Sequence, residues 1–548
     1  MPTSLPPVAL ATDRRGLLKA GALGLAGIAL PLSAAEGPKG FTHGVASGEP
    51  GDRQVLLWTR YVGGVDTRLG FEVAETLDFA RIVASGEALA SPQRDWCAKA
   101  KATALEPGKW YYYRFIAPSG ERSVIGRTRT MPVGKLASFK LAVFSCSNLG
   151  FGWFNAYAHA AEAGEFDLAV HLGDYYYEYK RGTYPSAQQA LAGRLLWPEH
   201  EAVLLADYRE RHANYRADPD LQRLHQLLPW VVMWDDHEVA NDSWKDGAEN
   251  HQPATEGDYA ARKAASERAF REWLPVSDDD WASYEIGDLA TLFRLESRHV
   301  ARTQPLDLLK AGDVPPDQAE AALIAFRDGS WRDPTHTLLG QTQESWLAAG
   351  LKRSVRARKP WQVLGQQIVM GSLAMPDAVA ETMRATTADW LKRRIHNTVA
   401  AAHVGLPFNM DAWDGYPAAR DRLLQSALAA DANLLVLSGD SHNAWAFDLD
   451  RKGARVGVEM ASQSVTSPGA EGTLNWMKPE DLAAALYTRN PQLKWADTAR
   501  RGYLAVELTP ASATGEWRFM SSVRQKGTAL SGTRRMTVMA GQRRFVAT

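Results

Sequence analysis

Two patterns of apolar residues follow one another along the chain. Toward the N-terminus, short apolar and aromatic runs stand after turn signals; the clearest are residues 55–60 and residues 110–116, the latter after Pro107-Gly108. Gly and Pro mark turns, and short β-rich runs at this spacing are typical of a β-sandwich. We therefore predict an N-terminal β-sandwich domain over residues 36–135.

A different pattern begins near residue 139. β-rich apolar runs alternate there with stretches whose apolar positions recur at helical spacing, the clearest being residues 259–273 and 344–351. The predicted strands are residues 140–144, 168–172, 230–234, 362–364 and 434–437. This alternation is typical of a layered α/β fold, so we predict an α/β domain over residues 136–548.

The first 35 residues have the pattern of an export signal. Arg14 and Arg15 precede an uncharged apolar run, residues 20–32, and the small residues 33–35 follow as a cleavage site. The run is shorter than the roughly 20 residues that a membrane-spanning helix needs. Paired arginines before such a run are typical of a Tat signal; a plain Sec signal and an N-terminal anchor are the alternatives. We expect export by the Tat machinery to the periplasm or the extracellular space.

Composition narrows the class of protein. Hydrophobic residues make up 45% and charged residues 23% of the 548 residues, which excludes disordered and polytopic membrane proteins. The 62 Lys and Arg residues balance 63 Asp and Glu residues, so no dominant basic field exists and we expect no specific nucleic-acid complex. Two cysteines are too few for a scaffold built on disulfides.

Polar side chains follow four of the predicted strands where each strand ends. They are Cys146 after the first strand, Asp174 and Tyr177 after the second, the Asp235-Asp236-His237-Glu238 cluster and Asn241 after the third, and Asp440 and His442 after the fourth. Ligands of open α/β sheets collect outside the carboxyl ends of strands, so these four ends can converge. Adjacent carboxylates repel unless cations neutralise them, and the pattern therefore predicts a metal site.

Cys146 has two interpretations. In an exported protein it could form a disulfide with Cys97, the second of the two cysteines. Cys97 belongs to the predicted β-sandwich, however, whereas Cys146 ends a core strand of the next domain. A thiolate at a strand end beside Asp and Tyr is typical of a transition-metal ligand, which we favour.

Eight motifs recur together from about residue 41 to residue 503. They are residues 41–50, 57–60, 145–147, 171–178, 234–238, 413–417, 438–442 and 464–469. As a set they resemble the PhoD-like alkaline phosphatase family. The resemblance implies an immunoglobulin- or fibronectin-like N-terminal module and a metallophosphoesterase-type domain, a two-sheet sandwich flanked by helices. It also implies a site that holds Fe³⁺ and Ca²⁺.

The resemblance assigns a role to each candidate residue. Cys146 and Tyr177 would bind iron, Asp174 would bridge iron and calcium, Asp236 would bind calcium, Asp440 and His442 would complete the site, Asn241 would be a further calcium ligand, and His237 would contact phosphate. One stretch departs from the family pattern, which often reads Leu-Asp-Thr-Arg: here it is Leu295-Glu296-Ser297-Arg298. The resemblance therefore does not define how this stretch lines the substrate cleft.

Three arginines are candidates for binding phosphate through two hydrogen bonds, namely Arg60, Arg298 and Arg420; the alternative is a surface or structural role.

The expected function is metal-dependent hydrolysis of small-molecule phosphate esters. One alternative is a phosphodiesterase of the phospholipase D kind, acting on phospholipids. The other is an exported phosphate- or metal-binding protein without turnover.

Overall fold

The computed structural model describes residues 39–546, so the predicted export signal lies outside the described residues. Within this range the strands form sheets of nine, seven and four strands. The nine-stranded sheet has the order β20 (Leu530–Met539), β19 (Ser512–Met520), β18 (Gly502–Leu508), β8 (Phe139–Phe144), β9 (Leu168–His171), β10 (Pro229–Val232), β1 (Gly40–Gly48), β2 (Val55–Val62) and β5 (Cys97–Ala102). Its central strands β8, β9 and β10 run parallel to one another.

The other two sheets have seven and four strands. The seven-stranded sheet has the order β11 (Ala282–Ile286), β12 (Ala290–Arg294), β13 (Trp361–Gly365), β14 (Leu434–Ser438), β16 (Ala454–Ala461), β15 (Ala444–Arg451) and β17 (Leu493–Asp497). The four-stranded sheet has the order β4 (Ile82–Ala90), β3 (Thr67–Ala74), β6 (Trp110–Ile116) and β7 (Gly126–Arg129).

The two large sheets face each other and bury a common apolar core. Val143 and Val170 of the nine-stranded sheet pack in one cluster with Leu292, Val363 and Leu435 of the seven-stranded sheet. Both faces of the central strands are covered, which is why these strands are continuous apolar runs in the sequence.

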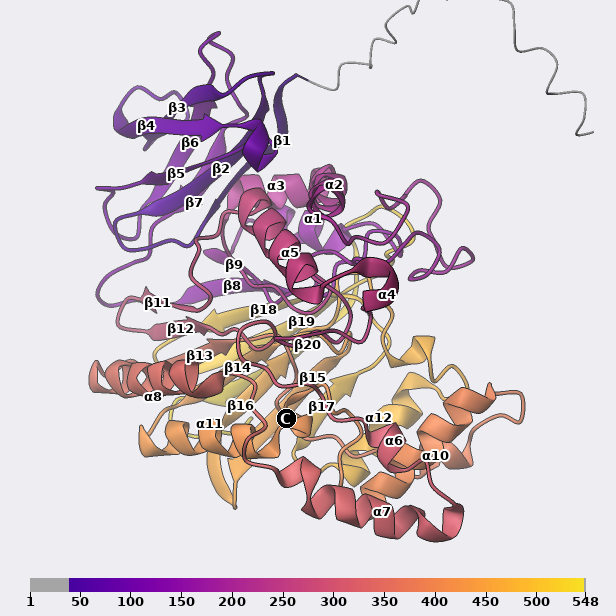
Figure 1. Cartoon of the computed structure of the whole chain (residues 1–548). Helices are drawn as coiled ribbons and strands as arrows, with labels where there is room; N and C mark the ends of the chain where they lie inside the picture. The colour runs from indigo at the N-terminus through magenta and orange to yellow at the C-terminus, as the bar shows by residue number, and fades with distance from the viewer. Residues whose placement is uncertain (1–38, 547–548) are drawn as a thin grey trace, which may run out of the picture. The chain divides into compact units, whose positions relative to one another are not determined.

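Helices cover the outer face of each large sheet (Figure 1). Those packed on the nine-stranded sheet are α1 (Asn155–Ala163), α2 (Leu205–Arg216), α3 (Pro219–Leu227) and α5 (Tyr259–Trp273). Those packed on the seven-stranded sheet are α8 (Gly340–Arg356), α11 (Pro417–Ala429) and α12 (Pro479–Arg489). The remaining α-helices are α4 (Pro253–Glu256), α6 (Leu308–Ala311), α7 (Pro316–Asp328), α9 (Ala378–Glu381) and α10 (Asp389–His403).

The N-terminal strands form two layers, but one of those layers belongs to a larger sheet. Val45 and Leu57 of β1 and β2 pack against Phe71 and Tyr113 of β3 and β6. At the same time β1 pairs in parallel with β10 through Ser47 and Gly48, so hydrogen bonding continues across the predicted boundary at residue 135. That boundary and the immunoglobulin- or fibronectin-like description stay predictions.

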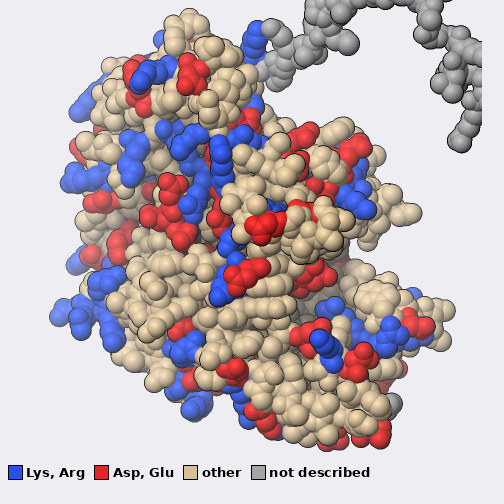
Figure 2. Space-filling model, viewed as in Figure 1, with Lys and Arg blue, Asp and Glu red and all other residues tan. Residues whose placement is uncertain are grey.

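The predicted α/β class is confirmed. The helix predicted over residues 259–273 coincides with α5, whose first turn is capped by the Asp258 side chain, an acceptor for the backbone N–H of Ala261. Among residues 39–546, no helix combines the length and the apolar character that crossing a bilayer requires. Figure 2 shows Lys, Arg, Asp and Glu interspersed over the face that it views.

Candidate metal centre

The predicted site residues meet where β8, β9, β10 and β14 end. Five residues in the loops that follow these strands hold a left-handed backbone: Cys146, Asp174, Asp242, Asp440 and His442 have φ between 49° and 62°. Such a conformation costs of order 1–3 kcal/mol for a non-glycine residue and concentrates at functional sites. The strand ends are therefore bent in a way that aims short polar side chains at one centre.

The first group of possible ligands contains sulfur, oxygen and nitrogen. One ligand atom each of Cys146, Asp174 and His442 lies within 4.8 Å of the others. The Tyr177 hydroxyl lies between them, 2.9 Å from Asp174 Oδ2 and 3.1 Å from His442 Nε2. Four residues from three strand ends thus surround one point.

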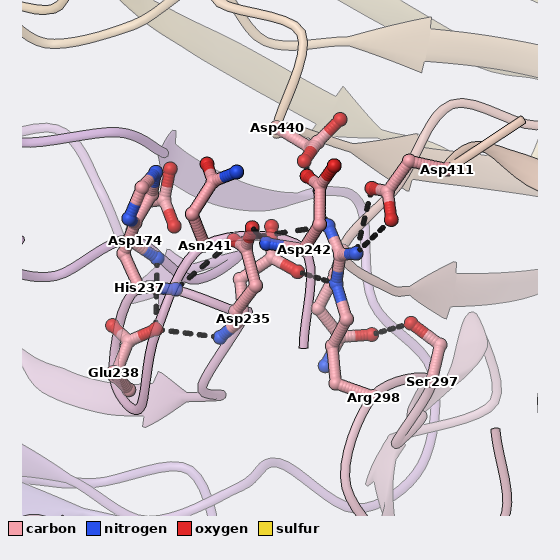
Figure 3. Close-up of polar contacts among 12 residues, drawn as sticks. Asp174, Asp235, His237, Glu238, Asn241, Asp242, Ser297, Arg298, Asp411 and Asp440 are labelled. Atoms are coloured by element: carbon pink, nitrogen blue, oxygen red, sulfur yellow. Dashed lines mark hydrogen bonds and ion pairs between the residues drawn. The ribbon is translucent and has the colours of Figure 1, made fainter. Parts of the chain in front are cut away.

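Carboxylates dominate the second group. Asp235, Asp236 and Asp440 offer oxygens within 4.8 Å of one another. One oxygen each of Asp174 and Asp236 and one ring nitrogen of His237 also lie within 4.8 Å of one another. Asp174 therefore takes part in both groups. Figure 3 shows Asn241 on the same side of the cluster as Asp174 and His237; its amide nitrogen donates to Glu249.

Arg298 lies among these carboxylates (Figure 3). Its fully buried guanidinium contacts Asp235, donates to Asp440 at 2.8 Å, and donates to both oxygens of Asp411 at 2.6 and 2.8 Å. The nearest oxygen of Asp236 is 3.8 Å away. A permanent cation thus neutralises part of the buried negative charge.

The His237 ring is held by a buried glutamate. Its Nδ1 lies 2.7 Å from Glu178 Oε2, and the Glu178 side chain is completely buried. Burial alone would lower the pKa of His237, but the carboxylates of Asp236, Glu178 and Asp174 raise it well above the ordinary value. The charges of these carboxylates favour the protonated form of the ring.

Two observations test whether cations fit this site: buried carboxylate oxygens without hydrogen-bond partners, and the pKa shifts of the candidate ligands. Asp174 Oδ1 and Asp235 Oδ2 are buried and have no hydrogen-bond partner among the residues that the structure describes. Burial raises the pKa values of Asp174, Cys146 and Tyr177 well above their ordinary ranges, and in the thiol and the phenol the Asp174 charge adds to the effect. A nearby cation would favour the charged form of each, so the donor set fits metal ions.

Two predicted arginines are not brought to the site. Arg60 in β2 donates to the Asp95 carboxylate and to Thr42, and it lies over the Trp273 ring. Arg420 in α11 pairs with Asp414. Their guanidinium groups pair with these partners, and the motif around Arg60 contributes to the N-terminal strands. The prediction that Arg60 or Arg420 binds phosphate stays a prediction.

The disulfide alternative for Cys146 is wrong. Cys97 and Cys146 are both free and buried. Cys97 packs with Ala46, Trp58 and Trp273, whereas Cys146 lies in the ligand group. Of the three consecutive tyrosines, Tyr175 and Tyr176 belong to the apolar core beneath the site.

Sequence reasoning missed four residues that shape the site. Asp235 and Glu238 were noted only as part of an acidic motif, Glu178 only as part of the resemblance, and Asp411 not at all. Glu238 accepts backbone N–H groups from Asp174, Tyr175 and Asp235, and so ties the ends of β9 and β10 together. In the sequence, the cluster of acidic residues marks Asp235 and Glu238. Asp411 lies in a loop that carries no such cluster.

Comparison with known proteins identifies the family. The profile of the PhoD-like phosphatase family matches residues 141–517, and that of the PhoD-like phosphatase N-terminal domain matches residues 27–132. The chain belongs to the PhoD-like phosphatase family. Alkaline phosphatase D of Bacillus subtilis (strain 168) is 31% identical over 558 residues, which cover 95% of this chain and 86% of that protein.

A solved structure described as "Structure of PhoD" agrees with this assignment. It is 29% identical, covers 93% of both chains and superimposes with a TM-score of 0.76. This PhoD-like phosphatase is therefore a phosphoric ester hydrolase with a mixed α/β fold, and its strand ends carry groups that can hold metal ions.

Proposed function

We propose that this PhoD-like phosphatase hydrolyses small-molecule phosphate esters outside the cytoplasm, with Fe³⁺ and Ca²⁺ as its metal ions. The observation that carries the proposal is the convergence of two chemically different ligand groups on Asp174. A bridging carboxylate between a group with sulfur and phenol and a group of carboxylates suits two different cations.

The chemistry of the donors supports the choice of metals. Thiolate, phenolate and imidazole ligands suit a transition metal, so Cys146, Tyr177 and His442 would hold Fe³⁺ together with Asp174. Calcium prefers oxygen, so Asp236 and Asp440 would hold Ca²⁺ on the other side of Asp174, with Asn241 as a further ligand. When bound, such cations polarise phosphoryl oxygens and lower the pKa of water.

The chain itself would position the ester and move a proton. Glu178 fixes the His237 ring and stabilises its imidazolium, which can then contact a phosphoryl oxygen or donate a proton to the departing alcohol. Arg298, which lies among Asp235, Asp411 and Asp440, would add positive charge near the bound phosphate. Phosphoryl transfer requires mainly such positioning and charge stabilisation.

One set of measurements tests the proposal. Metal content by elemental analysis is combined with rates on a phosphomonoester, a bis-ester and a phospholipid. The proposal requires iron and calcium in the purified protein and release of product from at least one ester. Activity confined to the phospholipid would favour the phospholipase D alternative. Metal-loaded protein that binds phosphate and turns over no ester would favour the binding-protein alternative.

Export is tested separately. Replacing Arg14 and Arg15 by lysine should leave the unprocessed protein in the cytoplasm, because paired arginines distinguish a Tat signal from a Sec signal. Cell fractionation measures this, and normal export of the variant would contradict the Tat assignment.

A further inference from the structure

The metal centre meets the solvent through few of its side chains. Cys146, Asp174, Tyr177 and the Asp235–Asp236 pair are buried. By contrast, the side chains of His442 and Asp440 are 18% and 17% exposed. Asn241 and Asp242 are partly exposed as well. A phosphate ester that reaches the ligands would therefore leave its alcohol portion near these exposed side chains.

Two tyrosines, which we call the aromatic border, lie beside His442 and His237. The rings of Tyr184 and His442 lie 14° from parallel with centroids 6.4 Å apart, and the Tyr184 hydroxyl is 3.4 Å from His442 Nδ1. The Tyr179 ring lies 5.3 Å from the His237 ring and 5.9 Å from Tyr184. Both tyrosines are partly exposed.

The surroundings of the partly exposed Asp440 side chain are acidic. Asp411 is 13% exposed and lies with Asp440 around the Arg298 guanidinium, and Asp242 adds a third carboxylate in Figure 3. An apolar alcohol that lay over these carboxylates would desolvate them without offering a hydrogen bond, which costs free energy. The aromatic border carries no such penalty.

The aromatic border is held in place before any ligand binds, Tyr184 through its ring and Tyr179 through its backbone. Tyr184 packs edge-on against the buried ring of Phe151, with centroids 4.7 Å apart. The backbone carbonyl of Tyr179 accepts a hydrogen bond from Arg211. Fixed rings lose little conformational entropy on binding, which is a property of good recognition surfaces.

We propose that Tyr179 and Tyr184 form the subsite for the alcohol portion of the ester, and that this subsite favours alcohols with a flat aromatic ring over small polyols. The proposal rests on the proposed function, in which His237 serves the departing alcohol. Because the Tyr179 ring lies beside His237, an alcohol that leaves there lies against this ring. These residues would then determine specificity without binding the metals.

The test compares two esters and one product. Tyr179→Ala and Tyr184→Ala are assayed with phenyl phosphate, with glycerol 2-phosphate, and with inorganic phosphate as a competitive inhibitor. One aromatic contact is worth about 0.5–1.5 kcal/mol, so KM for phenyl phosphate should rise roughly 2- to 10-fold. The KM for glycerol 2-phosphate and the inhibition constant of phosphate should change by less than about 2-fold, since neither ligand carries a ring.

Matched variants separate the subsite from general damage. Tyr179→Phe and Tyr184→Phe keep the rings and should keep the wild-type KM, and Tyr112→Ala removes a partly exposed tyrosine from the four-stranded sheet and should change nothing. Metal content is measured in every variant. A Tyr179→Ala enzyme that keeps its metals but weakens both esters equally overturns the subsite alone. A wild type that hydrolyses neither ester overturns the proposed function and the subsite together.

Discussion

Asp174 is the residue on which both ligand groups depend, because its carboxylate lies within reach of Cys146 and His442 on one side and of Asp236 on the other. We predict that Asp174→Asn lowers activity below about a tenth of the wild-type value, since even the residues behind metal ligands typically cost 10- to 100-fold when changed. An amide lacks the charge that holds two cations. The measurements are activity and metal content; activity above this level with normal metal content would remove Asp174 from the ligand set.

His237 differs from Asp174 because it is held by Glu178 rather than shared between ligand groups. We predict that His237→Ala loses 10²- to 10⁴-fold in turnover, the usual range for a positioned acid or base, while keeping most of its metal. Metal content and kcat, measured on the same preparation, distinguish a proton donor from a metal ligand. A metal-free variant would mean that His237 is itself a ligand.

Tyr177 provides a visible signal of its role. Burial and the charges of Asp174 and Cys146 raise the pKa of its phenol, so only a bound cation would hold it as a tyrosinate. If that cation is Fe³⁺, the purified protein should absorb visible light, and Tyr177→Phe should lose the band. Cys146→Ser, with iron measured in each protein, controls for the thiolate. An unchanged band in Tyr177→Phe would exclude tyrosinate ligation.

At the scale of elements, the turn after β9 is shaped by Gly173. Its φ of +113° belongs to a region that side chains rarely occupy, and a Cβ there would lie 2.4 Å from Asp235 Cβ and 2.8 Å from the Asp235 backbone nitrogen. The turn after β9 therefore packs directly on the turn after β10. This close approach brings Asp174 and Asp236 together.

We predict that Gly173→Ala destabilises the protein by about 1–3 kcal/mol more than its control, the usual cost of overpacking a well-packed site. The control is Gly182→Ala, where φ is also positive, +86°, and no atom lies within 4 Å of the added Cβ. Denaturant unfolding of both variants measures the difference. Equal destabilisation of the two would show that the steric contact with Asp235 does not matter.

At the scale of the whole molecule, the N-terminal strands are joined to the sheet that carries the site. Besides the β1–β10 pairing, Trp58 Nε1 donates to the carbonyl of Glu272, and Arg294 pairs with Glu49 in a buried contact of 3.0 Å. Removing one partner of a buried charge pair is strongly destabilising, by about 3–5 kcal/mol.

We therefore predict that residues 136–548 alone do not fold into an active enzyme. The truncated chain would expose the edge of β10 and leave Arg294 unpaired. Folding of the fragment is measured by circular dichroism and soluble yield, with the chain from residue 36 onward as the comparison. A soluble, active fragment would restore the boundary at residue 135 as one between independent domains.

The sequence by itself determined the class of fold and most of the candidate ligand residues. Apolar runs buried on both faces identify central strands by composition, and the polar residues after them are adjacent in sequence to those strands. Cys146, Asp174, Asp236, Asp440 and His442 could therefore be predicted from local pattern. The resemblance supplied the metals and the reaction, which spacing alone does not contain.

Only the tertiary structure decided which distant side chains join the site. Arg60 and Arg298 look equivalent in sequence. In the structure, however, Arg60 pairs with Asp95. Arg298 is surrounded by Asp235, Asp411 and Asp440. Asp411 lies in a loop more than a hundred residues from Arg298, and β1 lies beside β10 far along the chain. Such contacts depend on how sheets and loops pack together, so they cannot be predicted from the local pattern of apolar and polar residues.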